Sequence, residues 1–419
     1  MTQSGQDSFK ARGPLSDIVV LDLTVALAGP FASALLAGLG ARVIKVEGPD
    51  APDTSRNNAP YLGASGVTLT REHPDDFSIS ALNRLRNKEA VRLNLKHAQG
   101  RDVFADLLRK ADVVVENFSH GTLDRLGVGY SYARSIQPKI VYCSITGFGY
   151  GSPGPNKAMD AIIQALSGVM QVSGAEADPP TRIGLPVADL ITPLFGVVGI
   201  LSALHMAHTT GIGQHVDVSM LGTLTALMAG EGFDLLETLG VPLRTGPTVA
   251  RLTPFGVYPA ANGHIAICAP TDAFALSLFR AMGEPQLAED PRFSTRDARV
   301  ANRGELDARI EAWARARTVD DAVEALLAQG APAAAVRSPR EAVRDERVLA
   351  RKECVPLTHP EHGATAEVFG MGLPIKFSEA HVGFDRPAPG FGQHNQTIYR
   401  DLLGYSPERM RELEELGVI

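Results

Sequence analysis

A strand–helix–strand pattern at the start of the chain is the feature that most restricts its fold. The apolar run DIVVLDL (17–23) predicts a buried strand, AGPFASALLAGLG (28–40) predicts a helix opening at Pro30 and closing at Gly40, and ARVIKVE (41–47) predicts a second strand. Strands joined through a helix lie parallel and are connected by a right-handed crossover. The pattern therefore predicts an α/β protein built on a parallel sheet.

The same alternation continues for two hundred residues. Further strands are expected at 90–95, 112–118, 139–149 and 213–221, and helices at 97–111, 129–138 and 158–174. Thr192 as N-cap and Pro193 as first helical residue predict another helix, which ends near His208.

The alternation of strands and helices ends at about residue 228. The segment 253–270 predicts an antiparallel hairpin around Asn262-Gly263, and helices follow to about residue 330. We therefore predict a large α/β domain at 1–227, a small α+β domain at 228–335, and a segment at 336–419 that links and returns to the large domain.

Composition excludes several functions. The 419 residues carry a net charge of −7 without a basic segment, which disfavours a nucleic-acid binder. The start MTQSGQDSFK lacks the apolar core of a signal peptide. Three distant cysteines without a CxxC pair predict buried thiols in a reducing compartment and no metal site. These features predict a cytoplasmic protein.

The run 183–204 contains a single charged side chain, Asp189. Its length raises the possibility of a membrane span, but Pro186, Pro193 and Asp189 interrupt it, so a core helix is expected instead. A carboxylate in apolar surroundings costs several kcal/mol unless it is paired or functional. From the residues alone, Asp189 is either a satisfied cap or core carboxylate, or a functional group.

The turn after the first strand reads TVALAGP, not GxGxxG. A pyrophosphate therefore cannot approach this turn as in nicotinamide-binding proteins, although Glu47 stands where a ribose-binding acid would be. Free backbone N–H groups at the helix start still suit another phosphate or a carbonyl.

Several blocks, in order, resemble family III CoA-transferases of the formyl-CoA and carnitine-CoA transferase type (the CaiB/BaiF family), whose fold is shared by α-methylacyl-CoA racemase. The blocks are VLDLTVALAGPFASALLAGLGARVIKVEGP (20–49), LNRLRNKEAVRLNLK (82–96), ADVVVENFSHGTLDRLGV (111–128), PKIVYCSITGFGYGSPG (138–154), DAIIQALSGVM (160–170), GLPVADL (184–190), TGIGQHVDVSML (210–221) and GLPIKFS (372–378). The resemblance implies a Rossmann-like large domain, a smaller α+β domain and an interlocked homodimer.

The resemblance also implies a site. It makes Asp189 the catalytic nucleophile, acyl-CoA and a small carboxylic acid the substrates, and no cofactor permanently bound. The positions implied to contact coenzyme A are Leu27, Ala28, Leu93, Lys96, Glu116, Asn117, Phe118, Arg125 and Lys157. On residue type alone, Lys96 and Arg125 would be ordinary solvated charges.

Three departures from the family pattern matter. Gly48 stands where the transferases often have Arg, for which Arg42, Arg56 or Arg86 are possible substitutes, and 225–275 contains no glycine-rich flap. Met159 replaces the racemase histidine, and a thioether cannot shuttle a proton. A transferase is therefore favoured over two alternatives, a racemase-type isomerase and a non-catalytic CoA-binding homologue.

The expected chemistry is CoA transfer through an aspartyl mixed anhydride and an aspartyl-CoA thioester. Succinyl-CoA is a possible donor, with Arg182, Arg244 or Arg251 as candidates to pair with a second carboxylate, and the amides of 147–151 as candidate oxyanion donors. Asp160 is expected to cap a helix or join a polar network, and Gln164 either faces the active site or occupies a plain helical position.

Overall fold

The structure of the protein, a computed structural model, describes residues 13–152, 157–249 and 251–419. The N-terminal segment that was predicted to lack a signal peptide lies outside these residues. Two compact units are present: the first comprises 1–166, 185–226 and 343–419, and the second comprises 167–184 and 227–342. The second unit thus takes residues 167–184, which the sequence placed in the large domain.

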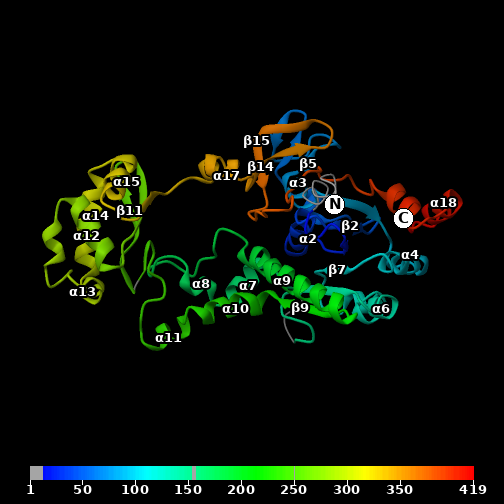
Figure 1. Ribbon diagram of the computed structural model, residues 1–419, viewed down its shortest axis with the longest axis horizontal. Helices are drawn as coiled ribbons and strands as arrows, with labels where there is room; N and C mark the ends of the chain where they lie inside the picture. Colours follow the sequence, from blue (N-terminus) through cyan, green and yellow to red (C-terminus); the bar gives the residue numbers. More distant parts are fainter. Residues whose placement is uncertain (1–12, 153–156, 250) are drawn as a thin grey trace, which may run out of the picture. The chain divides into compact units, whose positions relative to one another are not determined.

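The first unit is built on a six-stranded sheet whose order is β6-β2-β1-β7-β8-β9 (Figure 1). Every neighbouring pair in it is parallel, which confirms the predicted parallel sheet. The strands are β1 (Val19–Asp22), β2 (Arg42–Glu47), β6 (Lys88–Arg92), β7 (Val113–Glu116), β8 (Val141–Thr146) and β9 (His215–Ser219).

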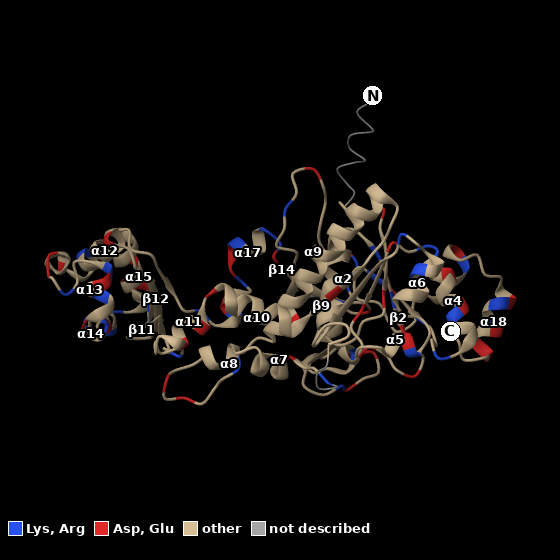
Figure 2. Cartoon of the chain, turned by 90° about the horizontal axis from the view of Figure 1, so that it is seen from below, with Lys and Arg blue, Asp and Glu red and all other residues tan. Residues whose placement is uncertain are grey.

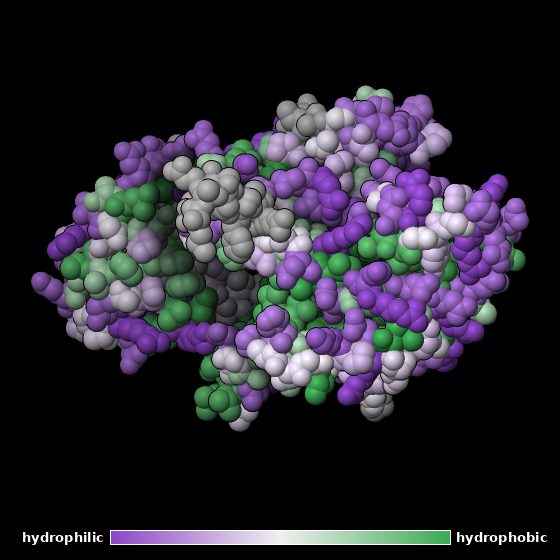
Figure 3. Space-filling view, turned by 45° about the vertical axis from the view of Figure 1, so that its right-hand side comes forward, coloured by the Kyte–Doolittle hydropathy of each residue, from purple (hydrophilic) through white to green (hydrophobic). Residues whose placement is uncertain are grey.

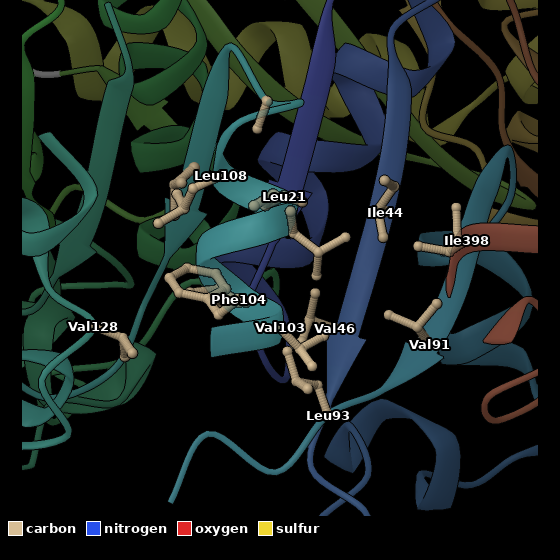
Figure 4. Packing of buried hydrophobic residues seen from close by; sticks show 14 of the residues in the cluster. Leu21, Ile44, Val46, Val91, Leu93, Val103, Phe104, Leu108, Val128 and Ile398 are labelled. Atoms are coloured by element: carbon tan, nitrogen blue, oxygen red, sulfur yellow. The ribbon is translucent and has the colours of Figure 1, made fainter. Parts of the chain in front are cut away.

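Alternate side chains of these strands enter two different cores, as the two-residue repeat of a strand requires. Val20, Val43 and Val115 pack with α2 (Ala28–Gly38) and α9 (Val187–Thr210). Leu21, Ile44 and Val114 pack with α4 (Ala98–Leu108), whose Phe104 lies over the sheet in Figure 4.

The C-terminal segment completes the second of these cores. Ile398 in the π-helical segment Gln396–Leu402 and Leu413 in α18 (Pro407–Glu415) are buried there, and Asn94 N donates to Val418 O at 2.8 Å. Because the chain end packs on the sheet, it belongs to the first unit.

Smaller elements surround the sheet. They are the 3₁₀ helix Thr54–Asn57, β3 (Tyr61–Gly63), β4 (Gly66–Thr68), β5 (Phe77–Ser78), α3 (Ile79–Arg84), α5 (Thr122–Arg125), α6 (Tyr130–Ile136), α7 (Asp160–Leu166), α10 (Met220–Gly230), α17 (Glu346–Ala350), β14 (Cys354–His359) and β15 (Gly363–Met371). The sequence analysis missed β3–β5 and the β14–β15 hairpin. The helix expected at 158–174 is also broken, because Gly168 adopts a left-handed φ of 86° between α7 and α8 (Val169–Val172).

Helix α9 begins at Val187, six residues before the predicted start at Pro193. The expected cap at Thr192 is therefore wrong, and Pro193 lies inside the helix. A proline there removes the hydrogen bond to the carbonyl four residues earlier, which is that of Asp189. Gly196 and Ile200 lie on the buried face, and a Cβ on Gly199 would lie 2.5 Å from Val216 Cγ1, so α9 packs close to the sheet.

By length and composition, α9 is the one helix among the described residues that could span a membrane. Core helices of soluble proteins pass the same test. Figure 2 shows α9 drawn almost entirely in tan, without Lys, Arg, Asp or Glu over most of its length. The acidic residue in its first turn is Asp189.

The second unit contains the antiparallel sheet β10-β11-β12-β13. Its hairpin of β11 (Leu252–Ala260) and β12 (Gly263–Cys268) confirms the turn predicted around Asn262-Gly263. The remaining elements are β10 (Thr248–Val249), α11 (Phe233–Thr238), α12 (Asp272–Met282), the 3₁₀ helix Pro285–Ala288, α13 (Arg296–Ala301), α14 (Arg303–Arg315), α15 (Val319–Ala328), β13 (Ala333–Ala335) and α16 (Pro339–Ala342).

The three cysteines are free thiols. Cys143 is buried as expected, whereas Cys268 and Cys354 are only half-buried, because both lie in strands of small sheets.

Fully buried charges lie under the first βα turn. Lys88 Nζ lies 2.8 Å from Asp22 Oδ2, and Lys45 Nζ lies 3.5 Å from Asp22 Oδ1 and 3.0 Å from Asp53 Oδ2. Burial alone would raise the pKa of Asp22, but the two ammonium groups outweigh it and hold that pKa well below its usual value. The two carboxylates, Asp22 and Asp53, are therefore stable as buried anions only because the two lysines lie beside them.

We predict that Lys88→Met lowers the free energy of unfolding by about 3–5 kcal/mol, because it leaves Asp22 buried with one cation fewer. Urea unfolding measures the change. The control is Arg109→Met, which breaks the exposed Arg109–Asp106 pair and should cost about 1 kcal/mol or less. Equal losses in the two variants would contradict the prediction.

Candidate active site

The turn that follows β1 is fixed by side chains from other strands. Asn117, directly after β7, accepts from Val25 N at 2.8 Å and donates to Val25 O at 2.9 Å. Thr24 N donates to Asp22 at 2.9 Å. A Cβ on Gly29 would lie 2.4 Å from Thr24 Cβ, so only glycine allows this approach. The TVALAGP motif is thus a rigid turn held by side chains around it.

The backbone N–H and C=O of Ala26 are both bonded to charged side chains. It has a left-handed φ of 68°, its N donates to Asp53 Oδ1 at 3.0 Å, and its O accepts from Arg84 Nη1 at 2.9 Å. An L-residue seldom adopts this φ unless its surroundings enforce it. These two charged residues therefore hold the turn beside Leu27 and Ala28 in one conformation.

Asp189 lies in the first turn of α9 and is half-buried. A second carboxylate, Asp160, approaches the same helix end from α7: its Oδ1 accepts from Ala188 N at 2.9 Å and its Oδ2 accepts from Gln164 Nε2 at 2.7 Å. Asp160 is thus both a helix cap and a member of a polar network, which is the role expected for it. Gln164 is fully buried and also donates to Leu185 O at 3.4 Å.

Burial, and then the nearby charge of Asp160, raise the pKa of Asp189 to about 6, while Arg84 opposes the rise. The helix N-terminus also favours an anion at this position. Asp189 is therefore a carboxylate of raised basicity that still ionises near neutral pH. Sequence reasoning did not identify Arg84 as a member of this group, and no motif singled it out.

The positions implied to contact coenzyme A follow the carboxyl ends of β1, β6, β7 and β8. The carboxyl ends of parallel strands share one edge of the sheet, which is where ligands bind in such folds. Lys96, Arg125 and Lys157 are exposed, and Phe118 is half-buried. Arg125 donates to Thr122 Oγ1 at 3.0 Å, and no described carboxylate pairs with Lys96 or Arg125.

Two of these positions have side chains turned inward. Leu93 belongs to the α4 core, so only its main chain is available to a ligand. Glu116 is buried, accepts from Phe118 N at 2.8 Å, and has its pKa raised to about 7 by burial. With Ser144, Tyr142 and His215 it lines a small cavity that the sequence analysis did not foresee.

The three arginines offered as substitutes at Gly48 are each engaged by another group of the chain. Arg42 pairs with Glu89 at 2.7 Å, Arg56 pairs with Glu47 at 2.7 Å, and Arg86 donates to the backbone carbonyl of Met371 at 2.5 Å. Whether any of them substitutes for the missing arginine stays a prediction.

The other arginine and amide candidates are also partly engaged. Arg182, Arg244 and Arg251 lie in the second unit, where they bond to Gly184 O, Gln171 and Glu231 respectively. In the 147–151 loop, the amide of Gly149 donates to Thr146 and that of Tyr150 donates to Asp217, so neither is free for an oxyanion.

Asp75, Glu361 and His362 place ligand atoms within 4.8 Å of one another. His362 Nε2 already lies 3.0 Å from Asp75 Oδ2, and Glu361 and His362 are exposed. An exposed ion pair accounts for this group without a metal.

The sequence and structure match known proteins from end to end. The profile of CoA-transferase family III matches residues 15–395. A succinyl-CoA–D-citramalate CoA-transferase of Chloroflexus aurantiacus is 33% identical, covering 97% of this chain and 98% of its own. A succinate–glutarate CoA-transferase of Agrobacterium fabrum is 33% identical, covering 94% and 97%. The crystal structure of a CaiB/BaiF family protein from Brucella suis has a TM-score of 0.80 at 31% identity and covers 93% of this chain and all of its own.

The chain therefore belongs to CoA-transferase family III and is an enzyme that transfers CoA. The mixed α/β fold with its six-stranded parallel sheet is that of the CaiB/BaiF proteins.

We predict that Asp160→Asn moves the acid limb of the pH dependence of kcat/KM about 0.5–1 pH unit lower, because removing the like charge lowers the pKa of Asp189. Initial rates with an acyl-CoA donor between pH 4.5 and 8 measure the limb. The matched control is Asp112→Asn, since Asp112 also accepts from a backbone N–H (Val19, 2.8 Å) but lies before β7, at the opposite edge of the sheet. An unmoved or higher limb in Asp160→Asn would contradict the prediction.

Proposed function

We propose that Asp189 is the nucleophile of a CoA-transferase that exchanges CoA between an acyl-CoA, such as succinyl-CoA, and a free carboxylic acid. The observation that carries this proposal is the setting of Asp189: a carboxylate of raised pKa that is acted on by Arg84, which is also bonded to the fixed turn at Ala26. The relatives named for succinyl-CoA support the donor.

The exchange proceeds through two kinds of covalent intermediate. An Asp189 oxygen attacks the thioester carbonyl and the C–S bond breaks. The CoA thiolate departs, and the acyl group remains on Asp189 as a mixed anhydride. The thiolate attacks the aspartyl carbonyl, which forms an aspartyl-CoA thioester and releases the first acid as a carboxylate. The carboxylate of the second acid then attacks the aspartyl-CoA thioester, which forms a new anhydride with Asp189 and releases the CoA thiolate again. This thiolate attacks the acyl carbonyl of the second acid and forms the new acyl-CoA. Asp189 is regenerated as a carboxylate.

Each step exchanges one activated acyl bond for another, so covalent catalysis divides one difficult displacement into easier ones. The exposed Lys96, Arg125 and Lys157 bind the distant nucleotide of CoA. This binding energy keeps the thiolate beside Asp189 between steps. The partial burial of Asp189 limits hydrolysis of the intermediates.

We predict that Asp189→Ala and Asp189→Asn lose CoA exchange by about 10³-fold or more. Mass spectrometry of new thioesters, with a panel of acyl-CoAs and free acids, measures the exchange, and hydroxylamine should trap the intermediate on Asp189 of the unmodified enzyme. The Asn variant should unfold at or above the temperature of the unmodified enzyme at pH 8, since ionising a carboxylate of raised pKa costs folding free energy at that pH. Exchange that persists in Asp189→Ala would overturn the mechanism.

Two other readings of the site predict different results. A racemase-type isomerase would exchange an α-proton with deuterated solvent without an acceptor acid. Met159 beside Asp160 supplies no second acid/base group for it. A non-catalytic homologue would bind CoA without any exchange.

We further propose that the enzyme is an interlocked homodimer acting in the cytoplasm. Leu194, Phe195, Val198 and Leu201 form an exposed apolar stripe on α9, and Met159 on the segment before α7 is 71% exposed. Apolar side chains also reach the surface in patches on the face shown in Figure 3. Contiguous apolar surface of this kind is typical of an interface, and a second copy of the chain would cover it.

We predict that Val198→Arg destabilises the dimer, because a buried unpaired charge opposes association. Light scattering after size exclusion should give twice 44.6 kDa for the unmodified chain, and the variant should lose this species to unfolded or aggregated chain. Leu69→Arg, at a residue outside this stripe that is 80% exposed, should remain dimeric. A monomeric unmodified chain would contradict the proposal.

A further inference from the structure

Arg84 is a cation near Asp189 whose charge no described carboxylate neutralises by direct contact. It ends α3 and is half-buried, and Nη1 donates to Ala26 O at 2.9 Å. No described residue engages its Nε or Nη2. These two nitrogens form one edge of the guanidinium, the edge that matches a carboxylate bidentately.

The electrostatics of the site call for such a group. Asp189 and Asp160 lie close enough for Asp160 to raise the pKa of Asp189, so the site repels an incoming acid, which is itself an anion. Arg84 is the cation that opposes this effect. Burial lowers the pKa of Arg84, and the charges of Asp53 and then Asp189 oppose that shift. Asp160 is already occupied by Ala188 N and Gln164 Nε2 and cannot turn away.

On the basis of the proposed function, we propose that Arg84 binds the second carboxylate of a dicarboxylic acid, which makes dicarboxylic acids the substrate class. The reacting carboxylate loses its charge when it becomes an anhydride or thioester, whereas the distal carboxylate stays charged in every intermediate. A fixed guanidinium therefore suits the distal group and holds donor acid and acceptor acid in the same place in turn. Because Nη1 is anchored on the rigid turn, the free edge keeps its direction without a cost in side-chain entropy.

The test compares each dicarboxylic acid with its monomethyl ester, which keeps the shape and removes the distal charge. With succinyl-CoA as donor, kcat/KM is measured for glutarate against monomethyl glutarate and for isotopically labelled succinate against monomethyl succinate, because transfer to unlabelled succinate only regenerates the donor. We expect the unmodified enzyme to prefer the diacid by about 10- to 100-fold. In Arg84→Gln both rates should fall, because Arg84 also supports the turn at Ala26. The diacid should lose much more than the ester, so that the ratio falls to about 3-fold or less, and Arg84→Lys should lie between.

A matched control separates the substrate role from support of the backbone. Arg71 also donates to a backbone carbonyl, that of Arg56 at 2.6 Å, and is exposed, so Arg71→Gln should keep the diacid preference. An unchanged ratio in Arg84→Gln, equal loss for diacid and ester, or no preference in the unmodified enzyme would each overturn the inference while exchange through Asp189 continues. Absence of exchange with every acid would overturn the proposed function and this inference with it.

Discussion

The buried charge cluster beneath the first turn is the interaction on which the rest of the first unit depends. Asp22, Lys45, Lys88 and Asp53 come from three adjacent strands and one loop, and each is held in place by another of them. An apolar core of the same volume would be more stable in many proteins. Here the charged groups also accept hydrogen bonds from the turn. Thr24 N donates to Asp22 and Ala26 N donates to Asp53, which fixes the backbone beside which CoA chemistry is proposed to occur.

The proposed acid site has the opposite character, because its charges are not balanced. Asp160 is fully hydrogen-bonded while Asp189 remains half-buried with a raised pKa, so the folded chain bears a cost at the residue that must react. Pro193 adds to this by leaving the Asp189 carbonyl without its helical partner. Local instability of this kind is common at functional sites, where the surrounding fold supports it. The wide contacts of α9 with β8, β9 and α2 supply that support.

Sequence patterns predicted those elements whose position depends on hydrophobic periodicity and on residues close together in the chain. The parallel strands, α2, α4 and the Asn262-Gly263 hairpin follow from apolar repeats and turn residues. The start of α9 could not be predicted in the same way, since its cap comes from Asp160, 28 residues earlier in the chain. The roles of Arg84 and Asp53 could not be predicted for the same reason. Both bond to the backbone of Ala26, which is distant in sequence and whose side chain does not indicate such partners. The engagement of Arg42, Arg56 and Arg86 likewise depends on tertiary contacts.

The raised pKa of Asp189 also bears on how the proposed nucleophile works. A more basic carboxylate is a stronger nucleophile, and one with a pKa of about 6 is still mostly ionised at neutral pH, so the gain in reactivity costs little in the reactive fraction. A pKa raised much further would leave the carboxylate protonated. Arg84 sets this limit, because its charge opposes the effects of burial and of Asp160. When a distal substrate carboxylate neutralises Arg84, that opposition weakens, and Asp189 becomes most basic when a diacid is bound.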